Sequence, residues 1–163
     1  MEKIIKRFST LSQCYHDIAL LMASQSREIV NDTKHYTVAL SGGRTPVGLF
    51  KYLSSAKFQQ VIPWSKIQFF WSDERYVSAD DEASNYLMAY ENLLSHIPVQ
   101  DAKIYKDPTD EPSCQEAAHK YHTILEDVFG HQSPKNSSES IFYPRFDLVL
   151  LGMGSDGHTA SLF

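Results

Sequence analysis

Residues 146–158 read FDLVLLGMGSDGH, a strand-like apolar run that passes directly into a loop with three glycines, one Asp and one His. A short, continuous apolar run is typical of a strand buried on both faces, as in a parallel sheet. In open sheets of this kind, ligands bind beyond the carboxyl ends of the strands. We therefore expect the glycine-rich loop to form part of a binding site.

Similar strand-like runs occupy residues 4–8, 36–40 and 67–71, and stretches of helical periodicity lie between the runs. Strands that alternate with helices are typical of βαβ units. The pattern predicts an α/β fold with a doubly wound, mostly parallel sheet flanked by helices. The length of 163 residues fits one domain, so we expect residues 1–163 to form a single α/β domain.

The first two helices have recognisable starts. Ser9 or Thr10 can cap a helix over residues 10–31, in which apolar side chains recur at helical spacing. Thr45-Pro46 is typical of a second helix start, with Thr45 as the N-cap and Pro46 as the first helical residue.

Two further helices follow. Ser84 is expected to begin one that Pro98 ends, and a longer helix through residues 117–128 is expected to stop at Gly130. Residues 131–144 are rich in Ser, Pro and Asn, which predicts a surface loop.

The composition excludes several classes of protein. The net charge of −5 and the lack of a basic run argue against a nucleic-acid partner. No run approaches the roughly 20 apolar residues of a membrane span. Cys14 and Cys114 lack the spacing of a metal-binding or disulfide motif, so no metal site is expected. The N-terminus carries no apolar segment of a secretory signal, and a cytoplasmic location is expected.

The loop after residues 36–40 reads Ser41-Gly42-Gly43-Arg44-Thr45. Two glycines let the backbone approach a ligand closely, and the helix that follows presents free N–H groups and the positive end of its dipole. Phosphate binds well at such a helix start. The alternative is a tight strand-to-helix turn that binds nothing.

The loop after residues 67–71 carries Asp73, Glu74 and Arg75. At the mouth of a crevice, Asp73 could hold a sugar hydroxyl or transfer a proton. Arg75 could bind an anion in a bidentate manner, through two parallel N–H···O hydrogen bonds. The alternative is a solvated loop in which Asp73 or Glu74 pairs with Arg75.

The glycine-rich loop contains Gly154, Asp156, Gly157 and His158. A His can act as a general base near neutral pH, and a nearby carboxylate can orient its ring. Glycines on either side allow a substrate to come close. This combination favours a catalytic role for His158, with Asp156 as its partner, over a structural one.

Together, three segments resemble the 6-phosphogluconolactonase family, within the wider glucosamine-6-phosphate isomerase/lactonase superfamily. They are LSGGRTP (40–46), FFWSDERYV with SN (69–77 and 84–85) and DLVLLGMGSDGHTASLF (147–163). The ending DGHTASLF resembles the lactonase branch and not the deaminase branch.

The resemblance implies hydrolysis of 6-phospho-D-glucono-1,5-lactone to 6-phosphogluconate in the oxidative pentose phosphate pathway, with no metal or organic cofactor. It implies that the SGGRTP loop contacts the substrate at its phosphate, that Arg75 contacts the anionic substrate and that His158 activates water. Asp73 matches the acid/base carboxylate of the deaminase branch, and here a hydroxyl contact or a structural role is expected.

The resemblance also implies a domain that continues beyond Phe163, so the chain is expected to be incomplete at its C-terminus. Residue 44 is Arg, where the family commonly has a small residue. The partner expected is a small phosphorylated sugar lactone, with no nucleic acid and no membrane, and a monomer is slightly favoured. The alternatives are an isomerase or deaminase of the same superfamily, a non-catalytic sugar-phosphate-binding module, or an inactive fragment.

Overall fold

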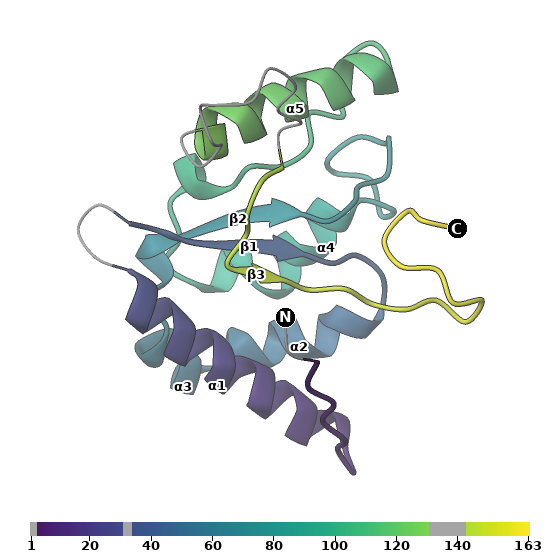
Figure 1. Cartoon of the computed structure of the whole chain (residues 1–163). Helices are drawn as coiled ribbons and strands as arrows, with labels where there is room; N and C mark the ends of the chain where they lie inside the picture. Colours follow the sequence, from purple (N-terminus) through teal and green to yellow (C-terminus); the bar gives the residue numbers. More distant parts are fainter. Residues whose placement is uncertain (1–2, 31–33, 131–142) are drawn as a thin grey trace.

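The structure is a computed structural model that describes residues 3–30, 34–130 and 143–163 (Figure 1). The Ser-, Pro- and Asn-rich segment predicted as a surface loop lies almost wholly outside the described residues.

Three parallel strands form the sheet, in the order β2-β1-β3. They are β1 (Tyr36–Leu40), β2 (Ile67–Trp71) and β3 (Leu148–Val149). Val38 of β1 is level with Phe69 of β2 on one side and Leu148 of β3 on the other. The predicted parallel α/β sheet is therefore confirmed.

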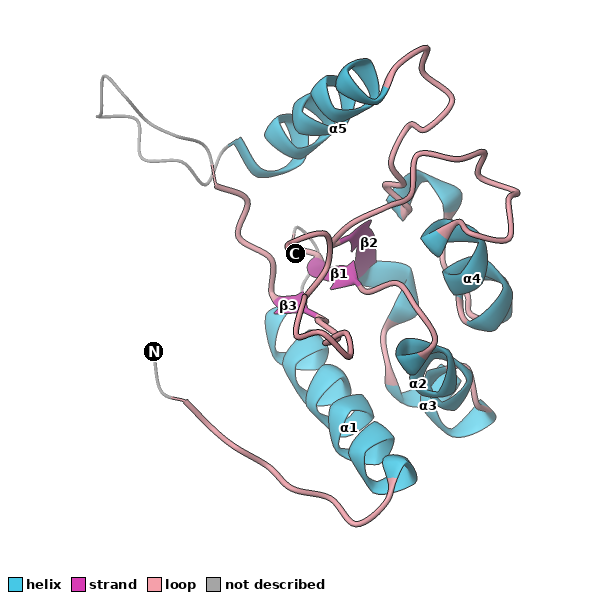
Figure 2. Cartoon of the chain, turned by 90° about the vertical axis from the view of Figure 1, so that its right-hand side faces the viewer, coloured by secondary structure: helices cyan, strands magenta, loops and turns pink. Residues whose placement is uncertain are grey.

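Helices cover both faces of this sheet, as the doubly wound prediction requires. In Figures 1 and 2, α5 lies on one side of the sheet and α1 to α3 lie on the other. The bounds are α1 (Leu11–Ile29), α2 (Thr45–Leu53), α3 (Ala56–Val61), α4 (Asn85–Asn92) and α5 (Cys114–Phe129), with 3-10 turns at Trp64–Lys66, Leu94–His96 and Asp101–Lys103.

Alternate strand residues supply two apolar layers. Val38 and Phe69 are fully buried in the core cluster that includes residues of α1 to α4. On the opposite face, Phe70 stacks on Tyr105, with ring centroids 4.7 Å apart, and meets Phe129 of α5 at 5.2 Å. Burial on both faces explains why β1 and β2 are mostly apolar. The same burial, expected for the apolar run over residues 146–151, is wrong: in β3, Leu148 is half-buried and Val149 is exposed, because this strand lies at the edge of the sheet.

Two expectations at the N-terminus have different outcomes. Thr10 caps α1 as predicted, because its hydroxyl accepts from the Gln13 N–H at 3.3 Å. The strand predicted over residues 4–8 is wrong: these residues are exposed and no described strand pairs with them. Without a neighbouring strand, the backbone N–H and C=O groups of such a run can form hydrogen bonds only with water, so no strand forms.

Helix ends also depart from expectation. The N-cap of α2 is Arg44 instead of Thr45, because Thr45 is already the first residue of the helix and Pro46 the second. Ser84 caps α4 as predicted, but this helix ends at Asn92, well before Pro98, because Leu93 leaves the helical region at φ −139°. The predicted stop of α5 at Gly130 is confirmed.

The last strand is shorter than residues 146–151. Only Leu148 and Val149 form β3, although the backbone of Asp147 donates to Thr37 O at 3.1 Å and that of Leu150 donates to Ala39 O at 2.9 Å. No helix among the described residues has the length and apolar character needed to span a membrane.

Candidate active site

The three predicted loops follow parallel strands, so they lie together at the carboxyl ends of the strands. The chain passes from β1 to β2 on one side, and β3 returns to the other side of β1. The carboxyl ends of β1 and β3 therefore border a point where the strand order reverses, which is where open α/β sheets bind ligands.

A pocket of about 290 Å³ lies at the carboxyl ends of the strands. It collects every residue predicted for the site except Asp156 and Gly157, which do not line it. Its lining consists of Ser41, Gly42, Gly43, Arg44, Thr45, Asp73, Arg75, Asn85, Gly152, Met153, Gly154, Ser155, His158 and Ala160. Asn85 and Ser155 are polar lining residues that sequence reasoning missed. The position of Asn85 next to the Ser84 cap suggested only a helix start.

The first loop needs both of its glycines, for different reasons. Gly43 has φ +84°, in the left-handed region that favours glycine. At Gly42 a Cβ would lie 2.1 Å from Oδ1 of Asn85, so the buried Asn85 side chain occupies that space. No side chain caps the N-terminus of α2, which leaves its first N–H groups open beside Arg44.

In the second loop, Glu74 serves as a cap for α4. Its carboxylate accepts from the backbone N–H of Asn85 at 2.7 Å and of Tyr86 at 2.8 Å. A carboxylate at this position also interacts favourably with the helix dipole. The alternative of an ion pair with Arg75 is wrong, since no ion pair within the described part of the chain involves Arg75.

Asp73 links two loops around the pocket. Its Oδ2 accepts from the hydroxyl of Ser161 at 3.0 Å, and its backbone carbonyl accepts from Nδ2 of Asn85 at 3.0 Å. The loop after β2 is thereby tied both to α4 and to the loop after β3.

The third loop folds His158 back onto Asp156. Nδ1 of His158 lies 2.5 Å from Oδ1 of Asp156. This hydrogen bond is the main cause that lowers the pKa of Asp156 below its usual value. Gly157, between them, has φ +92°, and a Cβ on Gly154 would lie 2.2 Å from Cε1 of the imidazole.

The contact with a carboxylate settles which ring nitrogen is free. Because an ionised Asp156 can only accept, Nδ1 of His158 donates to it, which leaves Nε2 as the ring nitrogen that Asp156 does not engage. The His158 side chain is 33% exposed, so a small molecule in the pocket can reach it. The arrangement therefore orients the imidazole ring of His158 where it lines the pocket.

The charges that line the pocket favour an anion. Arg44 and Arg75 both face it, and neither has an acidic partner among the residues that the structure describes. No group of three His, Cys, Asp or Glu side chains in the same described ranges could hold a metal ion.

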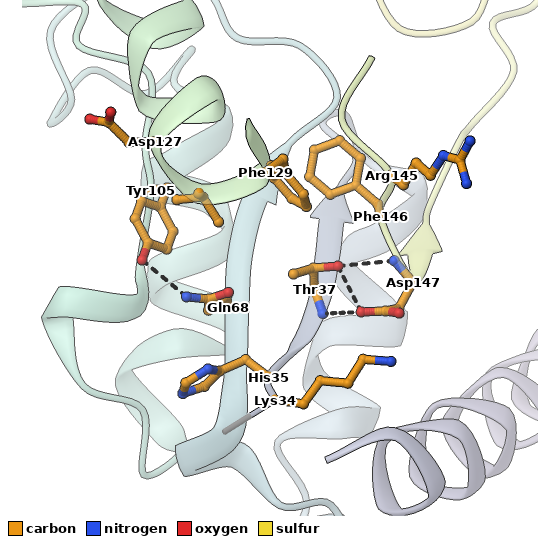
Figure 3. Close-up of a pocket in the computed structure, with 11 residues that line it drawn as sticks. Lys34, His35, Thr37, Gln68, Tyr105, Asp127, Phe129, Arg145, Phe146 and Asp147 are labelled. Atoms are coloured by element: carbon orange, nitrogen blue, oxygen red, sulfur yellow. Dashed lines mark hydrogen bonds between the residues drawn. The ribbon is translucent and has the colours of Figure 1, made fainter. Parts of the chain in front are cut away.

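A larger cavity of about 780 Å³ lies at the amino end of the strands (Figure 3). Four of its polar residues pair with one another: the Asp147 carboxylate accepts from the N–H and the hydroxyl of Thr37, both at 2.8 Å, and Nε2 of Gln68 donates to the Tyr105 hydroxyl at 3.1 Å. These bonds tie strands together. Volume alone therefore does not locate the site, and we assign it to the smaller pocket.

The chain is similar in sequence to one protein family and to several of its members. A family model described as glucosamine-6-phosphate isomerases/6-phosphogluconolactonase matches residues 9–163. The 6-phosphogluconolactonase of Synechocystis sp. is 42% identical over 127 residues, which is 78% of this chain and 48% of that protein. A probable 6-phosphogluconolactonase 3 of rice (Oryza sativa subsp. indica), chloroplastic by name, is 40% identical over 90% of this chain and 44% of that protein.

Among solved structures, the 6-phosphogluconolactonase from Trypanosoma brucei has a TM-score of 0.80 with this chain at 30% identity. The match covers 99% of this chain and 64% of that one. The chain thus shares the fold of that structure, and it spans about half the length of the curated relatives cited here.

Proposed function

The chain belongs to the glucosamine-6-phosphate isomerase/6-phosphogluconolactonase family, and we propose that it carries the catalytic pocket of a 6-phosphogluconolactonase. The reaction is hydrolysis of 6-phospho-D-glucono-1,5-lactone to 6-phosphogluconate. The observation that carries the proposal is one pocket lined by His158, whose Nδ1 is held by a carboxylate, and by two arginines that have no acidic partner in the part of the chain that the structure describes.

The phosphate binds at the loop between β1 and α2. The guanidinium of Arg44 and the uncapped N-terminus of α2 supply positive charge there, and Gly43 allows close approach of the backbone. Arg75, from the loop after β2, contacts the same anionic substrate from the other side of the pocket.

His158 is the general base. Water attacks the carbonyl carbon of the lactone, and Nε2 of His158 accepts the proton that the water loses. The Asp156 carboxylate stabilises the imidazolium that forms. The bond from the carbonyl carbon to the ring oxygen then breaks, and the imidazolium returns its proton to that oxygen. Arg75 or loop N–H groups stabilise the oxyanion of the tetrahedral intermediate.

The runner-up is an isomerase or deaminase, which the family description also includes. In that branch the position of Asp73 is expected to hold the acid/base carboxylate. Here both oxygens of Asp73 already accept hydrogen bonds, from Ser72 at 3.3 Å and Ser161 at 3.0 Å. This engagement, together with relatives named as lactonases, supports hydrolysis with Asp73 in a positioning role.

The ligand class that we propose is a small phosphorylated sugar lactone. The absence of a nucleic-acid partner and the monomeric state stay predictions. The cytoplasmic location also stays a prediction, and the name of the rice relative shows that this family occurs in chloroplasts too.

The proposal is tested by the rate of 6-phosphogluconolactone hydrolysis above the spontaneous background, and by calorimetric binding of the stable product. We expect His158→Ala to lower turnover by about 100-fold or more, the scale of a lost general base. His119→Ala, an exposed position on α5, is the matched control and should retain the wild-type rate. A His158→Ala rate equal to that of wild type, or failure of the wild-type chain to bind 6-phosphogluconate, would contradict the proposal.

A further inference from the structure

Asp107 lies near the carboxyl end of β2, on the same side of the sheet's strand ends as the pocket, but it has no role in the proposed hydrolysis. Ile104 pairs with Phe69 of β2 in a parallel bridge, and Tyr105 N donates to Phe69 O at 2.8 Å. The chain after Ile104 therefore runs beside β2 in the same direction, and Asp107 arrives next to the loop that follows β2.

The carboxyl group of Asp107 has acidic or neutral neighbours. Its Oδ2 is inaccessible to water and has no hydrogen-bond partner in the described part of the chain. The charges of Glu74 and Asp73, in the loop after β2, act on Asp107 and raise its pKa, and Asp107 in turn raises the pKa of Tyr121 in α5. The adjacent cation, Lys106, lies over an aromatic ring instead. A negative charge on Asp107 would thus be largely buried and, in the described part of the chain, stabilised by its own backbone N–H but by no ion pair.

These surroundings favour the protonated form of Asp107. Burial, followed by the charge of Glu74, raises the pKa of Asp107 to about 7. The proton is therefore half-occupied close to neutral pH, where its loss would place a further negative charge beside Glu74.

Glu74 connects Asp107 to the pocket. Its carboxylate accepts from the backbone N–H groups of Arg75 at 2.8 Å and Asn85 at 2.7 Å, and both residues line the pocket. Displacement of the Glu74 carboxylate would release the N-terminus of α4 and move the side chains of Arg75 and Asn85.

We propose that Asp107 is a positioning residue for the substrate pocket, which in its protonated form leaves Glu74 in place at the N-terminus of α4 and on ionisation displaces it. The effect on ligand affinity rests on the proposed function, since it assumes that the pocket takes a phosphorylated sugar. The effect on Glu74 does not depend on that function.

The link to Glu74 is tested by NMR on the wild-type chain, by following the backbone amide signals of Asn85 and Tyr86 from about pH 5.5 to about pH 8.5. We expect both signals to titrate with a midpoint near the pKa of Asp107. Asp107→Asn, which keeps the shape but cannot ionise, should abolish this transition. Asp110→Asn, an exposed residue of the same segment, is the matched control and should keep it.

The link to the pocket is tested by calorimetric titration with 6-phosphogluconate. The ratio of the Kd of wild type to that of Asp107→Asn cancels the ionisation of the ligand itself. We expect this ratio to be about one near pH 6 and to rise to about threefold or more near pH 8.5, because only the wild type ionises at this position.

The two measurements separate the two proposals. Amide signals that do not titrate, or a Kd ratio that stays constant with pH, would overturn the role of Asp107 even if the ligand binds. If neither protein binds 6-phosphogluconate, the proposed function fails, and the amide titration of wild type still decides whether Asp107 controls Glu74.

Discussion

At the scale of single residues, the site depends on backbone conformation as much as on side-chain type. Asp156 and His158 are two residues apart, a spacing that predicts no fixed geometry. They meet because Gly157 adopts a left-handed φ and Gly154 leaves room for the imidazole. The sequence could therefore nominate both residues, but their pairing follows from a loop conformation that the residue types alone do not define.

Gly43 allows this dependence on backbone conformation to be measured. A Cβ at Gly43 meets no atom within 4 Å, so the cost of Gly43→Ala comes only from φ +84°. We expect this change to lower the free energy of unfolding by about 1–2 kcal/mol. Gly43→Asn should lower it less, because Asn tolerates the left-handed region.

The matched control is Gly130→Ala. Gly130 is equally open to a Cβ, but its φ is −56°, which any residue adopts. Urea unfolding of the three variants should show no loss of stability for Gly130→Ala. Equal losses at the two positions would show that φ at Gly43 is not the cause.

At the scale of elements, sequence patterns predict buried elements well and their ends less well. The strands over residues 36–40 and 67–71 have the predicted bounds, because each is buried on both faces and all but one of its residues are apolar. Residues 4–8 have a similar pattern but no neighbouring strand, and a strand requires one. The cap of α4 shows a second limit: Ser84 was predictable from its position, whereas Glu74 reaches the same helix end from ten residues earlier.

Removal of Glu74 should therefore destabilise α4. We expect Glu74→Ala to lower the free energy of unfolding by about 1–2 kcal/mol, the scale of a lost cap and dipole interaction. The measurement belongs near pH 6, where Asp107 is largely protonated and the relief of its repulsion with Glu74 is small.

Glu82→Ala is the control for this prediction, because Glu82 is exposed and lies in the turn before α4. It should leave the urea midpoint unchanged. A midpoint shift for Glu74→Ala no larger than that for Glu82→Ala would mean that the cap contributes little to stability.

At the scale of the whole molecule, the alternation of strands and helices predicts a parallel sheet but not the order of its strands. The reversal at β1 places the loops after β1 and β3 side by side, and the Asp73–Ser161 contact adds the loop after β2. Three segments far apart in the sequence thereby form one pocket. The rule that ligands bind beyond the carboxyl ends of parallel strands was enough to predict those loops as the site. The positions of Asn85 and Asp107 next to the loops depend on how α4 and the chain beside β2 pack, which the sequence does not reveal.

The same packing makes global stability depend on pH. The pKa of Asp107 is about 7 in the folded chain and near its ordinary value of 3.8 in the unfolded chain, so the folded state binds the proton more tightly. Its contribution is fully present below about pH 4 and is lost progressively as the pH rises to about 7. A separation of about three pH units corresponds to roughly 4 kcal/mol as an upper scale.

Asp107→Asn isolates this contribution, because the other carboxylates titrate identically in both proteins. We expect the free energy of unfolding of the variant relative to wild type to increase between about pH 4 and about pH 7 and to stay constant above that. Urea unfolding at a series of pH values measures it. A difference that does not change with pH would mean that the folded chain does not hold the proton of Asp107. In that case the ionised Asp107 carboxylate would be stabilised by a nearby cation or by water. Its ionisation would then not displace Glu74.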